Sequence, residues 1–268
     1  MRLVTLGTAA AGVPRSGDSG TGNLLEHGET AAEGEDQAAS QRGVTRLLVD
    51  CGGGVLGALA AHAPLASLSG VFLSHLHNDH VADLYPLALW ARFTKRRLPI
   101  YGPAGTRTLL YRWFSLFSSD PDPYVQALDI HEMEEWRVYT LGELKFMACP
   151  VEHNVACFAL RAEAGGKRFV FSGDSRAGAL LEEAALDADL FLCEATYQDL
   201  APGREPEKSR DHHMTAREAG LVAKKARAKR LVLTHLKYDL DREVSRREAE
   251  EGYGAPVDVA EPGKAFEV

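Results

Sequence analysis

The chain has 268 residues, of which 45% are hydrophobic and 25% charged, and its formal net charge is −8. This composition is typical of a globular protein with a sizeable core, and the length fits a single α/β domain spanning residues 1–268. The negative charge argues against a general polyanion binder, because phosphate contacts need local Lys and Arg.

The predicted elements fall into two halves, each with strands first and then strands alternating with helices. Expected strands are Arg2–Leu6, Asn23–Glu26, Val44–Val49, Val71–Leu73, Leu98–Pro103 with its turn, Val125–Ile130, Trp136–Leu141, Leu144–Cys149, Cys157–Ala162, Arg168–Phe171, Leu190–Cys193 and Leu231–Thr234. Expected helices are Val55–His62, Val81–Phe93, Gly105–Phe117, Ala177–Ala185, Thr215–Ala228 and Arg242–Glu251. The polar stretch 28–43 is expected to be a hairpin tip. This order predicts two packed sheets with helices outside.

The cysteines indicate a reducing compartment. No two of them form a Cys-x-x-Cys pair, and each has apolar or glycine neighbours, as small buried thiols do: Cys51, Cys149, Cys157 and Cys193. The brief apolar stretch at Met1–Gly7 is read as a first strand rather than a signal peptide. No apolar run is long enough to cross a bilayer. We therefore expect a cytoplasmic protein without a membrane partner.

The segment Ser74–His80 holds three histidines and one aspartate and directly follows the apolar run Val71–Leu73. Because alternate residues of an extended turn point the same way, His75 and His77 can converge on one metal ion. Asp79 and His80 open the next helix and face a different point. The spacing therefore favours two metal ions, with zinc first and manganese or iron as alternatives. A disordered His-rich tract is the alternative interpretation, but a strand and a helix flank this segment closely.

Asp50 precedes the glycine turn Cys51–Gly54 and has two interpretations. Its carboxylate can accept a hydrogen bond from a metal-ligating histidine, or it can cap the following helix. The glycine turn itself could cradle a phosphate, although it lacks the Lys-Ser/Thr of a P-loop, so that signal is weak.

A binuclear site needs further ligands at strand ends, and the sequence offers three of them. His153 follows the strand that ends near Cys149, Asp174 follows Arg168–Phe171, and His235 follows Leu231–Thr234. Carboxyl ends of strands are where ligand sites of layered α/β folds lie. A helix cap would also explain Asp174.

Over nearly its whole length the chain resembles the metallo-β-lactamase-fold hydrolases, in the branch of ribonuclease Z and related phosphodiesterases. The resemblance rests on the ordered motifs Asp50, His75-x-His77-x-Asp79-His80, His153, Ser172-Gly173-Asp174-Ser175, Glu194-Ala195-Thr196-Tyr197, His213-Met214-Thr215-Ala216 and His235. It implies a four-layer αβ/βα sandwich. It also implies one metal ion on His75, His77 and His153, a second on Asp79, His80 and His235, and Asp174 as the bridge between them.

The resemblance also implies a phosphodiesterase mechanism. Two divalent ions would activate water near neutral pH and offset the charge that builds on phosphorus. Asp79 would take part in catalysis as well as in binding. His213, polarised by Glu194, would protonate the leaving alkoxide. His212 is the neighbouring alternative but lacks Thr-Ala at the matching offset, which favours a surface position for it.

The resemblance fails at the long basic arm with which ribonuclease Z grips transfer RNA. The interval from Gly102 to His153 contains no such arm and is acidic. The leading expectation is therefore hydrolysis of a small or single-stranded phosphodiester. The alternatives are a ribonuclease Z without the arm, a hydrolase of another ester (sulfate, thioester or lactone), and a metal-binding regulatory module. The basic runs at 95–97 and 224–230 are read as solvated helix ends rather than a nucleic-acid surface. A homodimer of this chain is a further candidate assembly.

Overall fold

The computed structural model describes residues 1–10, 13–28, 43–199 and 212–268 and consists of two seven-stranded sheets. Most of the predicted hairpin tip, residues 29–42, lies outside these ranges. The first sheet has the strand order β14 (Ala265–Glu267), β1 (Arg2–Gly7), β2 (Gly22–His27), β3 (Thr45–Val49), β4 (Gly70–Phe72), β5 (Leu98–Gly102) and β6 (Leu128–Glu132). The second has the order β13 (Asp258–Val259), β12 (Leu231–Thr234), β11 (Leu190–Glu194), β10 (Lys167–Phe171), β9 (Cys157–Ala164), β8 (Leu144–Val151) and β7 (Val138–Leu141).

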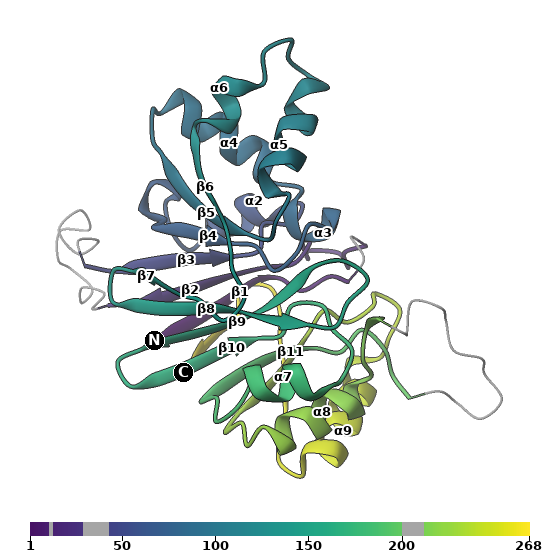
Figure 1. Ribbon diagram of the computed structural model, residues 1–268. Coiled ribbons are helices and arrows are strands. Elements are labelled where there is room, and N and C mark those ends of the chain that lie inside the picture. The colour runs from purple at the N-terminus through teal and green to yellow at the C-terminus, as the bar shows by residue number, and fades with distance from the viewer. Residues whose placement is uncertain (11–12, 29–42, 200–211) are drawn as a thin grey trace.

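Helices cover the outer face of each sheet (Figure 1). The first sheet carries α2 (Val55–Leu59), the short 3₁₀ turn η1 (Leu65–Ser67), α3 (Asn78–Val81), α4 (Leu84–Phe93), α5 (Thr106–Ser115) and α6 (Asp122–Val125). The second carries α7 (Ala179–Ala184), α8 (Ala216–Lys225) and α9 (Arg242–Tyr253). No helix in the described ranges is both long and apolar enough to cross a membrane.

Three apolar clusters hold the layers together. The central cluster lies between the sheets, where Phe72 of the first sheet meets Phe146 of the second with ring centroids 6.3 Å apart. The other two clusters join each sheet to its own helices, as Leu48 and Leu87 do on one side and Phe191 and Val222 on the other. The layers therefore run helix, sheet, sheet, helix, and the predicted four-layer αβ/βα sandwich is confirmed.

Strands β3 to β6 pair in parallel, and so do strands β10 to β13. Parallel neighbours place their carboxyl ends at the same edge of a sheet. Asp50 directly follows β3, Asp174 follows β10, Glu194 ends β11 and His235 follows β12. The topology thus collects these residues at one edge, although up to 185 positions of sequence separate Asp50 from His235.

One predicted strand and one predicted helix need correction. The expected strand Val125–Ile130 is wrong at its start, because Val125 ends α6 and the strand begins only at Leu128. Pro123 lies in the first turn of α6, where the missing N–H group costs nothing, and Tyr124 stacks on Phe114. The expected helix Val81–Phe93 is divided into α3 and α4 at Ala82 and Asp83, where the Asp83 carboxylate accepts a hydrogen bond from the Leu56 amide at 2.9 Å.

The C-terminal strands β13 and β14 were not predicted at all. Strand β14 pairs antiparallel with β1, and the amide of Thr5 donates to the carbonyl of Lys264 at 3.0 Å. This pairing joins the two ends of the described chain. The expectation that the cysteines are small buried thiols is confirmed, because all four are free and buried.

Candidate metal centre

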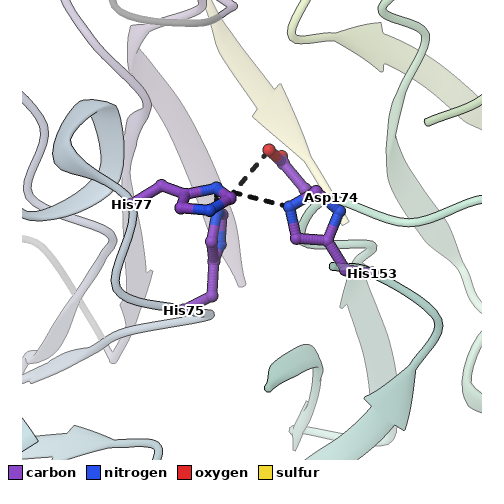
Figure 2. A group of neighbouring side chains, drawn as sticks. All are labelled: His75, His77, His153 and Asp174. Atoms are coloured by element: carbon purple, nitrogen blue, oxygen red, sulfur yellow. Dashed lines mark hydrogen bonds and ion pairs between the residues drawn. The ribbon is translucent and has the colours of Figure 1, made fainter. Parts of the chain in front are cut away.

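Three histidines and one aspartate from separate segments converge at the edge where the strands end (Figure 2). His77 Nδ1 lies 3.0 Å from His75 Nε2 and 3.3 Å from His153 Nε2. Asp174 Oδ2 lies 3.6 Å from His75 Nε2. His75 and Asp174 are buried, while His77 and His153 are half-buried, so the group is partly open to solvent.

A second group, Asp79, His80 and His235, lies against the other oxygen of Asp174. Asp174 Oδ1 is 3.4 Å from His80 Nε2 and 3.5 Å from His235 Nε2. Asp79 Oδ2 is 3.7 Å from His80 Nε2 and 3.5 Å from His235 Nε2. Asp174 therefore contacts both groups, one with each carboxylate oxygen.

The outward ring nitrogens of the first segment are held by Asp50 and Ser74. Asp50 Oδ2 lies 2.7 Å from His80 Nδ1 and accepts the Ser74 hydroxyl at 2.8 Å. The Ser74 hydroxyl oxygen lies 3.0 Å from His75 Nδ1. These partners place a proton on Nδ1 of both rings and leave the Nε2 lone pairs facing inward. The interpretation of Asp50 as the partner of a site histidine is confirmed, whereas α2 is capped by Gly54.

The outward nitrogens of His153 and His235 also have hydrogen-bond partners. His153 Nδ1 lies 2.9 Å from the carbonyl oxygen of His212, and His235 Nδ1 lies 2.9 Å from the Thr196 hydroxyl. The Thr196 hydroxyl donates in turn to Glu194 Oε2 at 2.6 Å, so it accepts from His235. Again each Nε2 lone pair points into the site. Histidine ligands of metals are oriented by such partners.

These groups fit divalent metal ions. Tetrahedral zinc with bonds of about 2.0–2.1 Å to nitrogen separates its ligand nitrogens by roughly 3.3 Å, close to the spacing around His77. Among the described residues, His80 Nε2, His235 Nε2 and Asp174 Oδ1 are buried without a hydrogen-bond partner. Buried polar atoms without partners are costly, and a shared cation would satisfy all three. Imidazole and carboxylate together suit zinc, manganese or iron.

The pKa shifts of His75 and Asp174 suit metal binding. Burial lowers the pKa of His75 well below its usual range, which keeps this imidazole neutral and able to bind a metal. Burial acts to raise the pKa of Asp174, but the surrounding histidines outweigh it and hold this pKa well below its usual range. The carboxyl is therefore ionised. A neutral imidazole and an ionised carboxylate are the forms that ligate metals.

Two of these positions have a backbone conformation that side chains rarely adopt. Asp50 has φ 62° and His235 has φ 56°, both in the left-handed region. Such a conformation costs on the order of 1 kcal/mol and persists only where the surroundings impose it. Strain at functional positions is common, and here it falls on one ligand candidate and on the partner of another.

Glu194 and His213 form a pair beside the two groups. His213 Nδ1 lies 2.9 Å from Glu194 Oε1, and the His213 ring stacks on His235 with centroids 5.7 Å apart. Glu194 is buried and also accepts the Ser175 amide at 2.7 Å. Burial acts to lower the pKa of His213, but the charge and hydrogen bond of Glu194 outweigh it and raise the pKa to about 9. The pairing with Glu194 therefore favours the protonated form of His213.

The structure brings together all nine predicted site residues. Asp174, His213 and His235 also lie close enough to one another to hold an ion. Ser74, Thr196 and the carbonyl of His212 were not predicted as partners. The Glu-Ala-Thr segment held the signal for Thr196, whereas a backbone carbonyl leaves no signal in the sequence. In the glycine turn, the Gly52 amide is already engaged, since it donates to the carbonyl of Thr21.

Comparison with known proteins places this geometry in a family. Residues 45–236 match the model of the β-lactamase superfamily domain. The chain belongs to the β-lactamase superfamily. An uncharacterised protein of Mycobacterium tuberculosis is 36% identical over 227 residues, covering 83% of this chain and 81% of that protein. The ribonuclease Z of Myxococcus xanthus is 28% identical over 276 residues, covering 83% of this chain and 88% of the relative.

A probable metallo-hydrolase of Bacillus subtilis, YhfI, is 28% identical over 274 residues and covers 100% of both chains. Its crystal structure, described as a metallo-β-lactamase-fold protein, superimposes with a TM-score of 0.79 over 99% of this chain and 98% of that one. The predicted resemblance to metallo-β-lactamase-fold hydrolases related to ribonuclease Z is thereby confirmed. Divalent-metal binding follows from this membership together with the two side-chain groups.

Proposed function

We propose that the protein is a binuclear metal-dependent phosphodiesterase acting on a small or single-stranded phosphodiester. One observation carries the proposal: Asp174 contacts both ligand groups, and the Glu194–His213 pair stands directly beside them. A structural metal site needs no such pair, which argues against a purely regulatory metal module. When bound, two divalent ions supply activation of water and stabilisation of charge on the phosphoryl oxygens.

The ligand roles are proposed as the sequence predicted them. His75, His77 and His153 would hold one ion, Asp79, His80 and His235 the other, and Asp174 both. Zinc is the first choice, with manganese or iron as alternatives. The buried Asp50, Ser74 and Thr196 would hold the rings in their ligating orientation.

The protein's own part in the reaction is proton delivery and orientation. His213 would donate the proton on Nε2 to the leaving oxygen, since its Nδ1 is engaged by Glu194. Glu194 holds the His213 ring in place and favours its protonated form. Glu194 itself accepts hydrogen bonds from Ser175 and Thr196. Buried and held on several sides, Glu194 cannot turn away, so the orientation of His213 is set before substrate arrives.

The substrate class is proposed from the surroundings of the site. The interval between Gly102 and Asp174 is occupied by α5, α6 and strands β6 to β10, with no long protruding insertion in it. The basic run 224–230 is largely neutralised, for example by the ion pairs Arg227–Asp187 and Lys229–Asp189. Both observations favour a small diester over a folded RNA. Ribonuclease Z activity is the second candidate, because a relative of that name is 28% identical over most of the chain.

The test is turnover by metal-loaded protein on a panel of substrates. The panel holds bis-(p-nitrophenyl) phosphate, cyclic nucleotides and pre-tRNA, together with a sulfate ester, a thioester and a lactone. We expect the small phosphodiesters to be hydrolysed and the activity to be lost in His77→Ala. Efficient 3′ processing of pre-tRNA with no hydrolysis of small diesters would establish the second candidate. Hydrolysis of a non-phosphate ester alone would refute the phosphodiesterase proposal.

A further inference from the structure

A cavity of about 630 Å³ opens on His153 and His213. Volumes of about 300–1,000 Å³ are typical of small-molecule sites, so this cavity suits a nucleoside-sized group and not a folded RNA. In the proposed function, His213 gives its proton to the leaving group. The group beyond the scissile oxygen therefore lies in this cavity, and this assignment rests on the proposed function.

The lining of the cavity also includes the charged side chains of Glu152, Arg176 and Glu218. Glu218 is engaged elsewhere, because its carboxylate accepts the Thr215 amide at 2.8 Å and closes the N-terminus of α8. Among the described lining residues, Arg176 is the one with a permanent positive charge. Arg176 belongs to neither ligand group and takes no part in the proposed proton transfer.

Arg176 is anchored at its backbone, while its side chain is exposed and paired. The Arg176 amide donates to the carbonyl of Glu152 at 3.0 Å, and Arg176 lies two residues after Asp174. The backbone from which its side chain extends is therefore fixed relative to the ligand groups. The side chain is 58% exposed, and its guanidinium pairs with the carboxylate of Glu152, which is 38% exposed. Exposed ion pairs of this kind contribute little to stability, so an incoming anion can replace Glu152 at small cost.

We propose that this cavity is the leaving-group subsite and that Arg176 makes it selective for leaving groups that carry an anionic group, such as a second phosphate. The planar guanidinium offers two parallel N–H donors, which match the oxygens of a phosphate, sulfonate or carboxylate. Glu152 holds the guanidinium over the cavity in the free protein and competes with the anion for it. Arg176 is thus a specificity-determining residue, and Glu152 sets how strict the selection is.

The experiment compares two substrates that differ in one charge. They are the methyl phosphodiesters of 4-hydroxybenzenesulfonate and of 4-hydroxybenzenesulfonamide, whose aryl leaving groups are nearly isosteric. The readout is the ratio of kcat/KM for the sulfonate ester to that for the sulfonamide ester, measured with metal-loaded protein. Because both esters share the same phosphorus, changes at the metal ions cancel in this ratio.

Arg176→Gln should lower the ratio by roughly tenfold, the size expected for one charge-assisted hydrogen-bonded contact. Glu152→Gln should raise the ratio, because the anion then meets no competing carboxylate. The matched control is Arg137→Gln. Arg137 is also 58% exposed and paired with a carboxylate, Glu134, but it does not line the cavity. Arg137→Gln should keep the parent ratio.

A second arm measures binding without turnover. The benzylphosphonate analogues of the two esters, in which a P–C bond replaces the scissile P–O bond, are titrated into metal-loaded protein by calorimetry. Arg176→Gln should weaken the sulfonate analogue selectively. An unchanged ratio and unchanged preference in Arg176→Gln would overturn the inference. Failure of the parent protein to hydrolyse either ester would instead refute the proposed function, and the calorimetric preference would then decide on Arg176 by itself.

Discussion

The carbonyl oxygen of Asp79 occupies the space that a side chain at Gly52 would need, since a Cβ there would lie 2.0 Å from it. The same carbonyl accepts the Thr21 amide at 2.9 Å, and the next carbonyl, of His80, accepts the Cys51 amide at 2.8 Å. The glycine turn after β3 is thus locked to the start of α3. Its role is to position two ligand candidates.

The first prediction is that Gly52→Ala weakens metal binding. The added Cβ must push the backbone at Asp79, which moves the Asp79 and His80 side chains away from Asp174. We expect metal affinity to fall by roughly tenfold or more, as for other changes that disturb ligand support. The free energy of unfolding should fall by about 1–3 kcal/mol, the usual cost of overpacking. Competition with a chromophoric chelator and thermal unfolding measure the two effects.

Gly53→Ala is the matched control for this prediction. A Cβ at Gly53 would meet its nearest neighbour, the Cβ of Ala82, at 3.7 Å, an ordinary contact. Metal affinity and stability should therefore remain near those of the parent protein. Equal metal affinity in the Gly52 and Gly53 variants would show that the locked carbonyl does not position the ligands.

The second prediction is that the protein holds two metal ions per chain. Seven ligand candidates are present, and one tetrahedral ion uses only about four. His77→Ala should reduce both the metal content and the activity, whereas His131→Ala should change neither, because His131 is an exposed histidine paired with Asp129. Elemental analysis after purification without chelator provides the count. One ion or none, not restored by added metal, would contradict a binuclear site.

Much of this centre could be predicted because its ligands directly follow strands. Asp174 and His235 each come after a short apolar run that predicts a buried strand, and parallel pairing brings such ends together. The partner of Asp50 could be named only as a class, a ligating histidine. That it is His80 and not His75 depends on where the chain turns between His75 and α3, which no local pattern encodes.

The missed features depend on contacts between distant residues. Strand β14 exists because it pairs with β1, about 260 positions away in the sequence, and a three-residue strand carries too few side chains to show a period. His212 was expected at the surface from its side chain. Its backbone carbonyl nevertheless accepts a hydrogen bond from His153, a contact that the side chain cannot reveal. The strand expected from Val125 begins later because Pro123 and the stacking of Tyr124 on Phe114 favour a helix there.

The third prediction concerns pH. If His213 acts as a proton donor, turnover of a poor leaving group is full while the ring is protonated and falls as the pH rises through its pKa. Burial lowers that pKa, and Glu194 raises it above the ordinary value for histidine. Glu194→Gln removes the raising charge, so the alkaline limb of the kcat profile should move to lower pH. Rates for methyl phenyl phosphate from about pH 6 to about pH 10 measure this limb.

Two comparisons keep the pH prediction specific. Glu163 on β9 pairs with Arg168 on β10, away from the site. Glu163→Gln should therefore leave the alkaline limb of the kcat profile in place. Bis-(p-nitrophenyl) phosphate should show a weaker alkaline limb, since p-nitrophenolate departs without a proton. An alkaline limb that stays put in Glu194→Gln would mean that another group supplies the proton.

The fourth prediction separates proton donation from metal binding at His213. In the proposed scheme neither ion needs this histidine, so His213→Ala should keep both ions and the folded state. It should still lose roughly 10²–10⁴-fold in turnover of a poor leaving group, the usual contribution of a positioned general acid. The loss should shrink for p-nitrophenyl esters. Metal analysis and kcat for the two kinds of ester, measured on the same preparation, provide the comparison.

The double variant tests whether Glu194 acts through His213. Glu194→Gln alone should show the same leaving-group trend more mildly, because it disturbs the orientation of His213 without removing it. Combined with His213→Ala it should add little, since residues that act as one unit are not additive. Loss of an ion in His213→Ala would instead make His213 a ligand, an arrangement that its closeness to Asp174 and His235 allows. Full turnover of poor leaving groups in that variant would move the donor elsewhere, and His212, which lines the same cavity, would be substituted next.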